Sequence, residues 1–509
     1  MIDPRSAPST ATAGLARSTV QGVFWIGGGQ AVRQVIRAVS SVVLARLLLP
    51  ADFGLMGMAA VFFSAAGMLT EFGIGSAVVQ SDNPDEITLS SAFWTNTALS
   101  MVVAVLLTAF SPAIAQFYGE PNVAPVLSAL SLSLVIGASM VVPRAILNRR
   151  LDFRRIARAE VVGSVIGSVT AIALAAAGFG VWALVSQPLV GTGASMAMVW
   201  FGSGWVPSRV YSWAAVAPLV GFSVWVLGSF FLHFASRNVD QLLIGRVWGK
   251  EQLGFYALAF QLMTVPVSQV AAVVAKVLYP ALAHVKKDPA RIRGGFLRAV
   301  TAIGMVTYPM FLGLFAVSND LVPVAFGERW MPMRPVLDVF CFSGILITVG
   351  AQVRSIYMSL GRTRTQFLCE LVTVPPAVLA YLAMVGFGIR GVAFAFLVGH
   401  LVTFAVNHSV GFRLVGLTWH TYLTALSKPL LAAAAMAGVL LVGARPALEA
   451  LGAGPVARLS ISVPLGVALY VLFSWIVNRE MLLDTIGTVR GAASRRQGSV
   501  APASDPGEL

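Results

Sequence analysis

Apolar stretches, each of about twenty residues or more, recur along the chain between polar segments from about residue 20 to residue 477. A helix that crosses the hydrocarbon core of a membrane needs ~20 predominantly apolar residues. The pattern therefore predicts an all-α polytopic membrane protein with about fourteen transmembrane helices. Their expected bounds are 21–48, 53–79, 89–111, 123–146, 157–177, 180–201, 214–245, 253–282, 296–317, 335–359, 365–385, 390–411, 426–443 and 460–477.

The composition agrees with this pattern. Of the 509 residues, 57% are hydrophobic and 11% are charged, whereas soluble domains carry roughly 25% charged residues. The two polar ends, residues 1–19 and 481–509, lack long apolar runs, and we expect them to be disordered cytoplasmic tails. The two cysteines, Cys341 and Cys369, have no disulfide or metal-site spacing.

The net charge of +14 reflects where the lysines and arginines lie along the chain. With the N-terminus inside and fourteen alternating helices, 22 of them fall on the cytoplasmic side, eight on the outer side and five deep within spans, where residues at the ends of spans are counted with the side that they adjoin. This positive-inside bias predicts a multi-pass protein of the bacterial inner membrane with both termini cytoplasmic. No basic arm or aromatic-basic module indicates a nucleic-acid partner.

The chain repeats itself at an offset of about 200 residues. The identical pairs at that offset are Trp25 and Trp225, Gly28 and Gly228, Arg37 and Arg237, Val39 and Val239, Arg46 and Arg246, Gly54 and Gly254, and Ala59 and Ala259. At an offset of 208, Gly178–Val181 matches Gly386–Ile389. An even number of helices in each copy puts both copies in the same orientation, so we expect pseudo-twofold symmetry about an axis along the membrane normal.

The repeat divides the chain into an N-lobe of helices 1–6 (20–205), a C-lobe of helices 7–12 (206–412) and two extra helices, 13 and 14 (413–480). Two parallel bundles leave a cleft between them, and transporters of this build hold their substrate there.

Polar residues inside the predicted spans indicate what the cleft binds. The first helix carries Gln30, Arg33, Gln34 and Arg37 on one face, because their spacing is helical. The corresponding part of the seventh helix carries His233, Arg237, Asp240 and Gln241. A charge at mid-bilayer costs about 3 kcal/mol or more, so such stripes face a wet cavity or pair with each other, as Arg237 and Asp240 could.

Lys276 and Arg354 add two further cations inside predicted spans, and Glu71 is an acid within the second. We therefore predict two groups of site residues. The substrate-binding candidates are Gln30, Arg33, Gln34, Arg37, His233, Arg237, Gln241, Lys276 and Arg354, and the coupling candidates are Glu71 and Asp240. A structural ion pair is the alternative for each charged member. Glu160, near the start of its helix, is expected to complement the helix dipole.

Six arginines between Arg144 and Arg158 form the densest cationic loop. Topology and contact with anionic lipid headgroups explain it, and capture of a diphosphate headgroup is the alternative. The sequence holds no Gly-rich phosphate loop with a lysine and no metal-ligand spacing. We therefore predict no catalytic residue, no metal, no cofactor and no enzymatic activity.

Three segments carry a family resemblance. The stretch from Val23 to Gln80, with Leu-Leu-Leu-Pro-Ala-Asp-Phe-Gly at 47–54, resembles the polysaccharide-export branch of the MOP flippase superfamily. Arg149–Arg154 and Gly178–Leu184 are similar to the same branch, which includes colanic acid, succinoglycan and teichuronic acid exporters. The resemblance covers about 20–415.

The resemblance implies a flippase that moves an undecaprenyl-pyrophosphate-linked oligosaccharide, a repeat unit of exopolysaccharide or lipopolysaccharide, by alternating access. Membrane lipids are then expected partners, and a polysaccharide polymerase or glycosyltransferases further ones. The alternatives are a multidrug exporter, a lipid II-type flippase, or a scaffold of a polysaccharide synthase complex. Multidrug exporters use acidic cavity residues, whereas cations outnumber acids within these spans.

Overall fold

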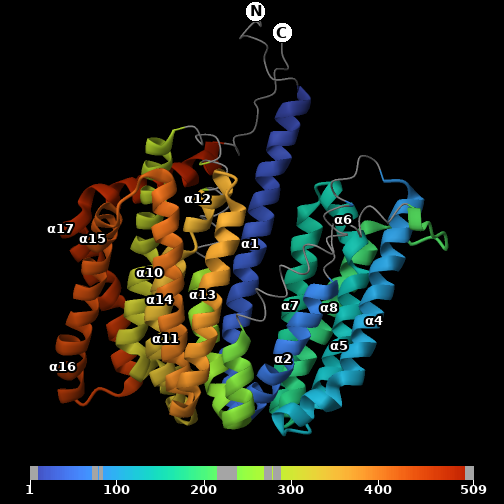
Figure 1. Ribbon diagram of the computed structural model, residues 1–509, viewed down its shortest axis with the longest axis horizontal. Coiled ribbons are helices and arrows are strands. Elements are labelled where there is room, and N and C mark those ends of the chain that lie inside the picture. The colour runs from blue at the N-terminus through green and yellow to red at the C-terminus, as the bar shows by residue number, and fades with distance from the viewer. Residues whose placement is uncertain are drawn as a thin grey trace, which may run out of the picture. The chain divides into compact units, whose positions relative to one another are not determined.

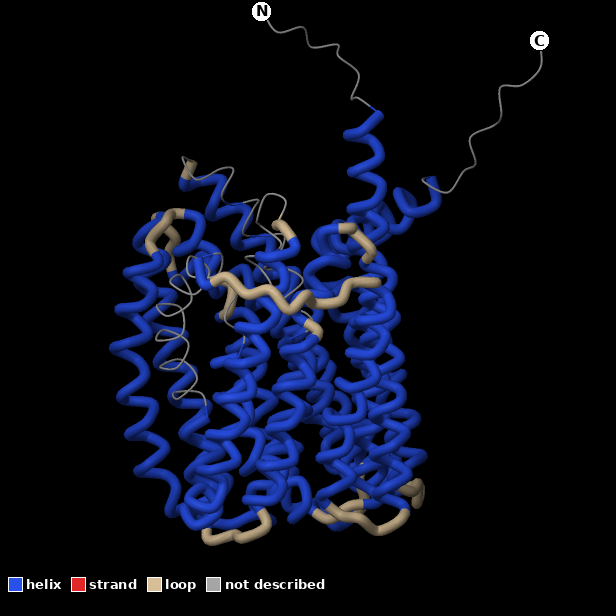
Figure 2. The backbone as a smooth tube through the Cα atoms, turned by 90° about the vertical axis from the view of Figure 1, so that its right-hand side faces the viewer, coloured by secondary structure: helices blue, strands red, loops and turns tan. Residues whose placement is uncertain are grey.

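The computed structural model describes residues 10–70, 78, 84–214, 238–268, 278, 282 and 288–498, with side chains throughout except near the two ends. These residues form helices joined by short loops and contain no strand (Figure 2). Within them, nine segments are long and apolar enough to cross a membrane. The predicted all-α polytopic fold is confirmed, while the count of fourteen helices stays a prediction.

The chain divides into two compact units, Met1–Leu258 and Ala259–Leu509. This division follows spatial contacts, whereas the predicted lobes follow the sequence repeat, so the lobe boundaries stay a prediction. Each unit is described by itself below.

Seven labelled helices form the first unit, together with the beginning of a further helical stretch over residues 238–268 (Figure 1). They are α1 (Thr10–Leu47), α2 (Pro50–Thr70), α4 (Glu86–Tyr118), α5 (Val123–Ser139), α6 (Val141–Arg149), α7 (Phe153–Ala176) and α8 (Val181–Ser203).

Small residues let α7 and α8 pack closely. A Cβ atom added to Gly163 would lie 2.0 Å from Ser195 Oγ, and one added to Gly167 would lie 2.4 Å from the carbonyl oxygen of Gln187. Glycine is therefore needed at both positions, as in many helix pairs within membranes. This packing fixes α7, which carries part of the candidate site.

The second unit contains the remaining labelled elements. They are α10 (Pro289–Ala325), η1 (Glu328–Met333), α11 (Arg334–Gly350), α12 (Val353–Ser359), α13 (Thr363–Met384), η2 (Val385–Phe387), α14 (Gly388–Val415), α15 (Trp419–Gly438), η3 (Val439–Ala444), α16 (Arg445–Ala450) and α17 (Pro455–Gly498). Buried aromatic rings of Phe296, Phe412 and Tyr422 join α10, α14 and α15, with centroids 4.9 to 6.2 Å apart.

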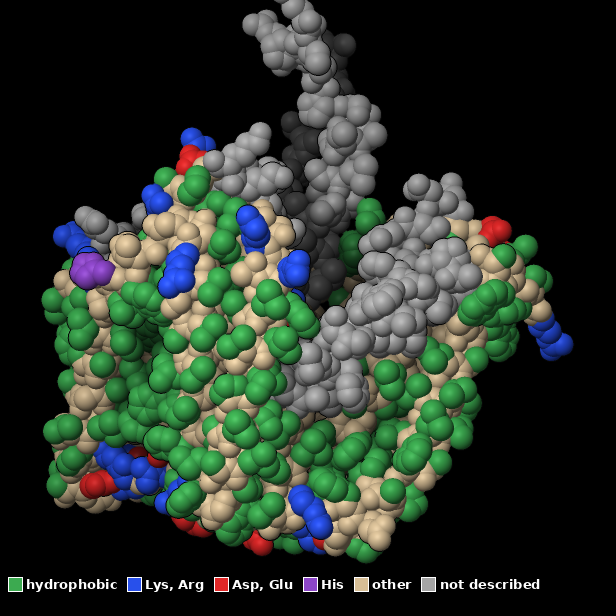
Figure 3. All heavy atoms as spheres, viewed as in Figure 1, with side chains coloured by type: hydrophobic (Ala, Val, Ile, Leu, Met, Phe, Trp, Pro, Cys, Tyr) green, Lys and Arg blue, Asp and Glu red, His purple; other side chains and the backbone are tan. Residues whose placement is uncertain are grey.

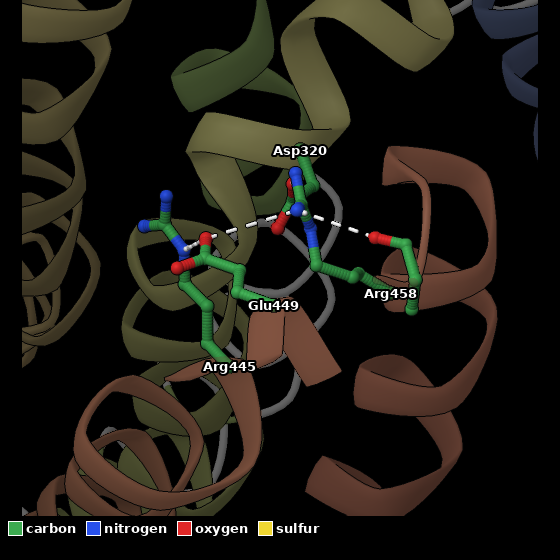
Figure 4. Close-up of polar contacts among 5 residues, drawn as sticks. Asp320, Arg445, Glu449 and Arg458 are labelled. Carbon is green, nitrogen blue, oxygen red and sulfur yellow. Dashed lines mark hydrogen bonds and ion pairs between the residues drawn. The ribbon is translucent and has the colours of Figure 1, made fainter. Parts of the chain in front are cut away.

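A buried ion pair fastens the last helix to α10 (Figure 4). Arg458 at the start of α17 places Nη2 2.7 Å from Asp320 Oδ1, and only 6% of the Asp320 side chain is exposed. Arg445 and Glu449 form a more exposed pair beside it, at 2.9 Å. Charges this deeply buried need partners, so the pair fixes α17, which lies outside the sequence repeat, against the unit.

Hydrophobic side chains cover the helix flanks visible in Figure 3, and charged side chains gather near the helix ends. Phe201, Val442 and Leu451 are each at least 80% exposed. Large exposed apolar surfaces of this kind face lipid rather than water in a membrane protein.

Candidate functional site

The polar stripe of α1 lies beside the beginning of α7. The two helices meet where Gly29 packs on Ala157, since a Cβ atom added to Gly29 would lie 3.1 Å from the Ala157 Cβ. The absence of a side chain at Gly29 therefore allows a close approach. We call the polar residues along this contact the α1–α7 seam, and they are Trp25, Arg33, Arg37, Arg154, Arg158 and Glu160, with Arg144 of α6.

A single carboxylate holds two arginines in the seam. Arg33 Nη1 lies 2.9 Å from Glu160 Oε2, with side chains 22% and 17% exposed. Arg144 pairs with the other oxygen of Glu160. The partner of Arg33 thus comes from α7, and Glu160 does more than complement a helix dipole. The three side chains together keep one net positive charge.

Arg37 adds a second positive charge to the seam. It lies four residues beyond Arg33 on the same face of α1, and its side chain is exposed. Within the described ranges it has neither an ion pair nor a hydrogen bond. Arg33 also keeps a buried Nε without a hydrogen-bond partner there. The exposed Arg37 therefore gives the seam guanidinium donors that are available for an anion.

Gln30 and Gln34 lie on the same stretch of α1. Gln30 is exposed and Gln34 is half-buried. Their amide groups can donate and accept hydrogen bonds, which suits them to a ligand that carries both phosphate and hydroxyl groups.

The six arginines between Arg144 and Arg158 separate into three kinds. Arg149, Arg150 and Arg155 donate to the carbonyl oxygens of Val78, Ser203 and Gly202 at 3.2, 2.8 and 2.8 Å. Arg144 binds Glu160. Arg154 and Arg158 lie over the Trp25 ring, 5.2 and 5.9 Å from its centroid. Half of the loop's arginines thus stabilise neighbouring backbone, and the other three lie on the seam.

Asp240 is the described candidate for coupling. It is 1% exposed, and Tyr256 Oη donates to its Oδ2 at 2.7 Å. Its Oδ1 is buried without a hydrogen-bond partner in the described part of the chain. Gln241, next to it, is half-buried. The arrangement leaves one oxygen of a buried carboxyl group able to carry a proton.

Arg354 belongs to the second unit. It is exposed near the beginning of α12, and no partner of its side chain occurs among the described residues. Four predicted site residues lie outside the described ranges, namely Glu71, His233, Arg237 and Lys276. The described residues contain no group of His, Cys, Asp and Glu side chains that could hold a metal ion.

Sequence reasoning considered Arg144, Arg154 and Arg158 only within a loop whose capture of a diphosphate headgroup was the alternative, and it missed Trp25. Their positions depend on packing between helices more than a hundred residues apart. The available signal was Gly29, a small residue in a charged helix, together with the density of arginines near the start of α7.

Comparisons with known proteins agree with this fold. The family described as Polysaccharide biosynthesis protein matches residues 43–335. The lipopolysaccharide biosynthesis protein WzxC of Escherichia coli (strain K12) is 27% identical over 82% of this chain and 85% of its own length. The succinoglycan biosynthesis transport protein ExoT of Rhizobium meliloti (strain 1021) is 26% identical over 94% of this chain and 97% of its own length.

Solved structures show the same fold at lower sequence identity. The lipid II flippase MurJ, in an inward closed conformation, is similar over 89% of this chain and 98% of its own, with a TM-score of 0.71 and 14% identity. The eukaryotic MATE transporter AtDTX14 has a TM-score of 0.53 and 15% identity over 82% of this chain and all of its own. The chain therefore belongs to the Polysaccharide biosynthesis protein family, as the resemblance of its sequence to polysaccharide exporters predicted.

Proposed function

We propose that this protein is a flippase that carries an undecaprenyl-pyrophosphate-linked oligosaccharide, a repeat unit of exopolysaccharide or lipopolysaccharide, across the bacterial inner membrane by alternating access. The observation that carries the proposal is the α1–α7 seam, where Arg33 and Arg144 share the single carboxylate of Glu160 and the exposed Arg37 lies one helical turn beyond Arg33. A transporter of this family needs a cationic site for an anionic headgroup, and the seam supplies one.

The chemistry of the seam suits a diphosphate. Guanidinium groups bind phosphate oxygens through paired, charge-assisted hydrogen bonds. At ~4 Å and an effective dielectric constant near 20, each such pair gains about 4 kcal/mol before desolvation. Arg37 is open to a ligand, and the Arg33 side chain is 22% exposed. A diphosphate can therefore bind both arginines while Glu160 remains between Arg33 and Arg144.

The order of residues along α1 suggests a direction of travel. Trp25, under Arg154 and Arg158, is twelve residues before Arg37, which is roughly 18 Å along a helix. In the predicted orientation Trp25 is at the cytoplasmic end. The headgroup first meets Arg154 and Arg158, and then Arg33 and Arg37 deeper in the membrane.

The remaining predicted residues complete the proposed site. Seven other candidates are proposed to contact the headgroup or the first sugars, namely Gln30, Gln34, His233, Arg237, Gln241, Lys276 and Arg354. Asp240 and Glu71 bind the coupling proton, and the free Oδ1 of Asp240 supports this role. The proposal includes cytoplasmic termini, and the partners that make or consume the repeat unit are glycosyltransferases and a polymerase.

The proposal is tested by replacing both seam arginines. Arg33→Gln together with Arg37→Gln is introduced on a plasmid into a strain that lacks this gene, and exported polymer and lipid-linked repeat units are measured. We expect at least a tenfold loss of polymer with repeat units accumulating in the inner leaflet. Arg209→Gln, an exposed cation beyond α8, is the matched control and keeps normal export.

Membrane abundance is measured for each variant. Normal export by the double variant at normal abundance would exclude the seam as the headgroup site. Rescue of a strain that lacks its cell-wall precursor flippase would instead assign lipid II as the cargo.

A further inference from the structure

Three helix turns lie at one end of the first unit (Figure 1). They are the turns between α1 and α2, α4 and α5, and α7 and α8. Residues of all three turns line a cavity. The cavity has a volume of about 380 Å³, and Lys250 of the following helical stretch completes it. Its chemically distinctive lining residues are Asp52, Asn122, Phe179, Trp182 and Lys250. This end of the unit is the outer one in the predicted orientation.

The position of Asp52 is set by the turns themselves. Its Oδ2 accepts a hydrogen bond from the Leu49 amide at 3.0 Å, which caps the beginning of α2. Its Oδ1 faces Gly180, where an added Cβ atom would lie 3.1 Å away and where φ is +55°. Among the described residues no donor reaches this Oδ1. A rigid turn thus presents one unsatisfied carboxylate oxygen at the cavity.

Glu120 arranges two further polar groups. The Lys250 Nζ and the Asn122 Nδ2 both donate to its Oε1, at 3.0 and 3.3 Å. The ammonium group has three donors and the amide oxygen accepts. Two ammonium N–H groups and the Asn122 Oδ1 are therefore available to a ligand. Asp52, Glu120 and Lys250 together carry one net negative charge, which does not favour an anionic group here.

Two aromatic rings complete the lining. The side chains of Phe179 and Trp182 are 56% and 43% exposed, and the Trp182 indole N–H has no acceptor in the described part of the chain. Aromatic residues gather at membrane interfaces in general. An interfacial belt explains the rings, but it does not explain why a carboxylate, an amide and an ammonium group converge beside them.

We propose that this cavity binds a pyranose ring of a saccharide. A pyranose has an apolar C–H face, which packs on an aromatic ring, and a rim of hydroxyl groups, which need both donors and acceptors. Trp182 and Phe179 supply the aromatic rings. The hydrogen-bond donors and acceptors come from Asp52, Asn122 and Lys250. Ligand pockets span roughly 300–1,000 Å³, so 380 Å³ suits one or two sugar rings.

The site takes a neutral sugar of the cargo as it reaches the outer side. That role in export rests on the proposed function, whereas saccharide binding itself does not.

The repeat provides a matched comparison. The turn before α14 lines a smaller cavity of about 250 Å³ with Met384, Phe387, Arg390, Gly391 and Phe394. At the offset of 208, Phe387 corresponds to Phe179, and Arg390 replaces Trp182. This cavity has an aromatic ring but no carboxylate or amide side chain, and it is not expected to bind sugar.

Saturation-transfer NMR of the full chain in detergent tests the proposal, with glucose, galactose, mannose, N-acetylglucosamine and glucuronic acid as probes. We expect transfer to at least one neutral sugar, reduced at least fivefold in Trp182→Ala and in Asn122→Ala and unchanged in Phe387→Ala. No transfer to any probe, or wild-type transfer in Asn122→Ala and Trp182→Ala, would overturn the proposal. Size-exclusion profiles show whether each variant is folded. If Trp182→Ala does not fold, the test uses Trp182→Leu together with Asn122→Ala, whose substituted side chain is exposed.

The double variant Arg33→Gln and Arg37→Gln separates this proposal from the proposed function. It is expected to bind sugar like the wild type while it fails to export polymer. If Trp182→Ala bound no sugar but exported polymer normally, the cavity would remain a sugar-binding site without a part in export.

Discussion

Two glycines that correspond in the sequence repeat touch each other in the first unit. A Cβ atom added to Gly54 of α2 would lie 1.6 Å from the carbonyl oxygen of Lys250. One added to Gly254 would lie 1.9 Å from the carbonyl oxygen of Pro50 and 3.2 Å from the Gly54 nitrogen. Side chains are thus excluded at this crossing, and Gly54→Ala is the perturbation that tests it.

The cost of that substitution follows from the geometry. Real Cβ atoms essentially never approach a heavy atom within 3.0 Å, so a distance of 1.6 Å requires the two backbones to separate by more than 1 Å. The obstacle is a peptide carbonyl, which cannot rotate away as a side chain can. Overpacking costs ~1–3 kcal/mol and occasionally more, while alanine gains about 1 kcal/mol over glycine in a helix. Because the clash is with backbone, we take the upper end of the overpacking range and expect a net loss of about 2 kcal/mol.

Thermal unfolding in detergent measures this loss, with Gly67→Ala as the control in the same helix. A Cβ atom at Gly67 has its nearest neighbour at 3.8 Å, the Cδ2 of Leu134, so that variant should unfold at or above the wild-type temperature. For Gly54→Ala we expect a Tm lower by roughly 2–4 °C. Adding Gly254→Ala should cost less than its separate effect, because both fill one crossing. Equal Tm values for Gly54→Ala and the wild type would refute the reasoning.

Two further predictions concern buried carboxylates. Asp320→Asn should destabilise the protein by ~3 kcal/mol in thermal unfolding, because it leaves the charge of Arg458 without its nearest partner, and the more exposed Glu449→Gln by less than ~1 kcal/mol. A larger effect at Glu449 would reverse this ranking. Glu160→Gln should lower membrane abundance, measured by immunoblot, because Arg33 and Arg144 then repel one another. Unchanged abundance would contradict this structural role of Glu160.

Local sequence signals predict the helices and several of their ends. The Gly-Phe-Gly match marks the turn at 178–180, and the structure gives Gly178 and Gly180 positive φ values of +84° and +55°. Such conformations favour glycine. The glycines of the motif are therefore explained by the backbone conformation of the turn. The same local reasoning places Arg33 and Arg37 on one face, because helical spacing alone decides that.

The partners of these residues do not follow from spacing. Glu160 reaches Arg33 from a helix 127 residues further along the chain, and the approach depends on the missing side chain of Gly29. A carboxylate within reach changes the expected state of the arginine from unpaired to paired. The candidate site was thus predictable as a stripe of charge, but its balance of charge required the packing.

The sequence repeat bears on both local spacing and packing. In an arrangement with twofold symmetry, a residue that touches its own counterpart lies next to the axis. The contact between Gly54 and Gly254 lies within the first unit, and the pseudo-twofold relation of the predicted lobes stays a prediction. Sequence comparison pairs the two glycines but does not reveal that they touch, because residues that correspond in a repeat need not lie in contact. The sequence indicates such a crossing only by having glycine at both positions, since only glycine permits backbones to meet so closely.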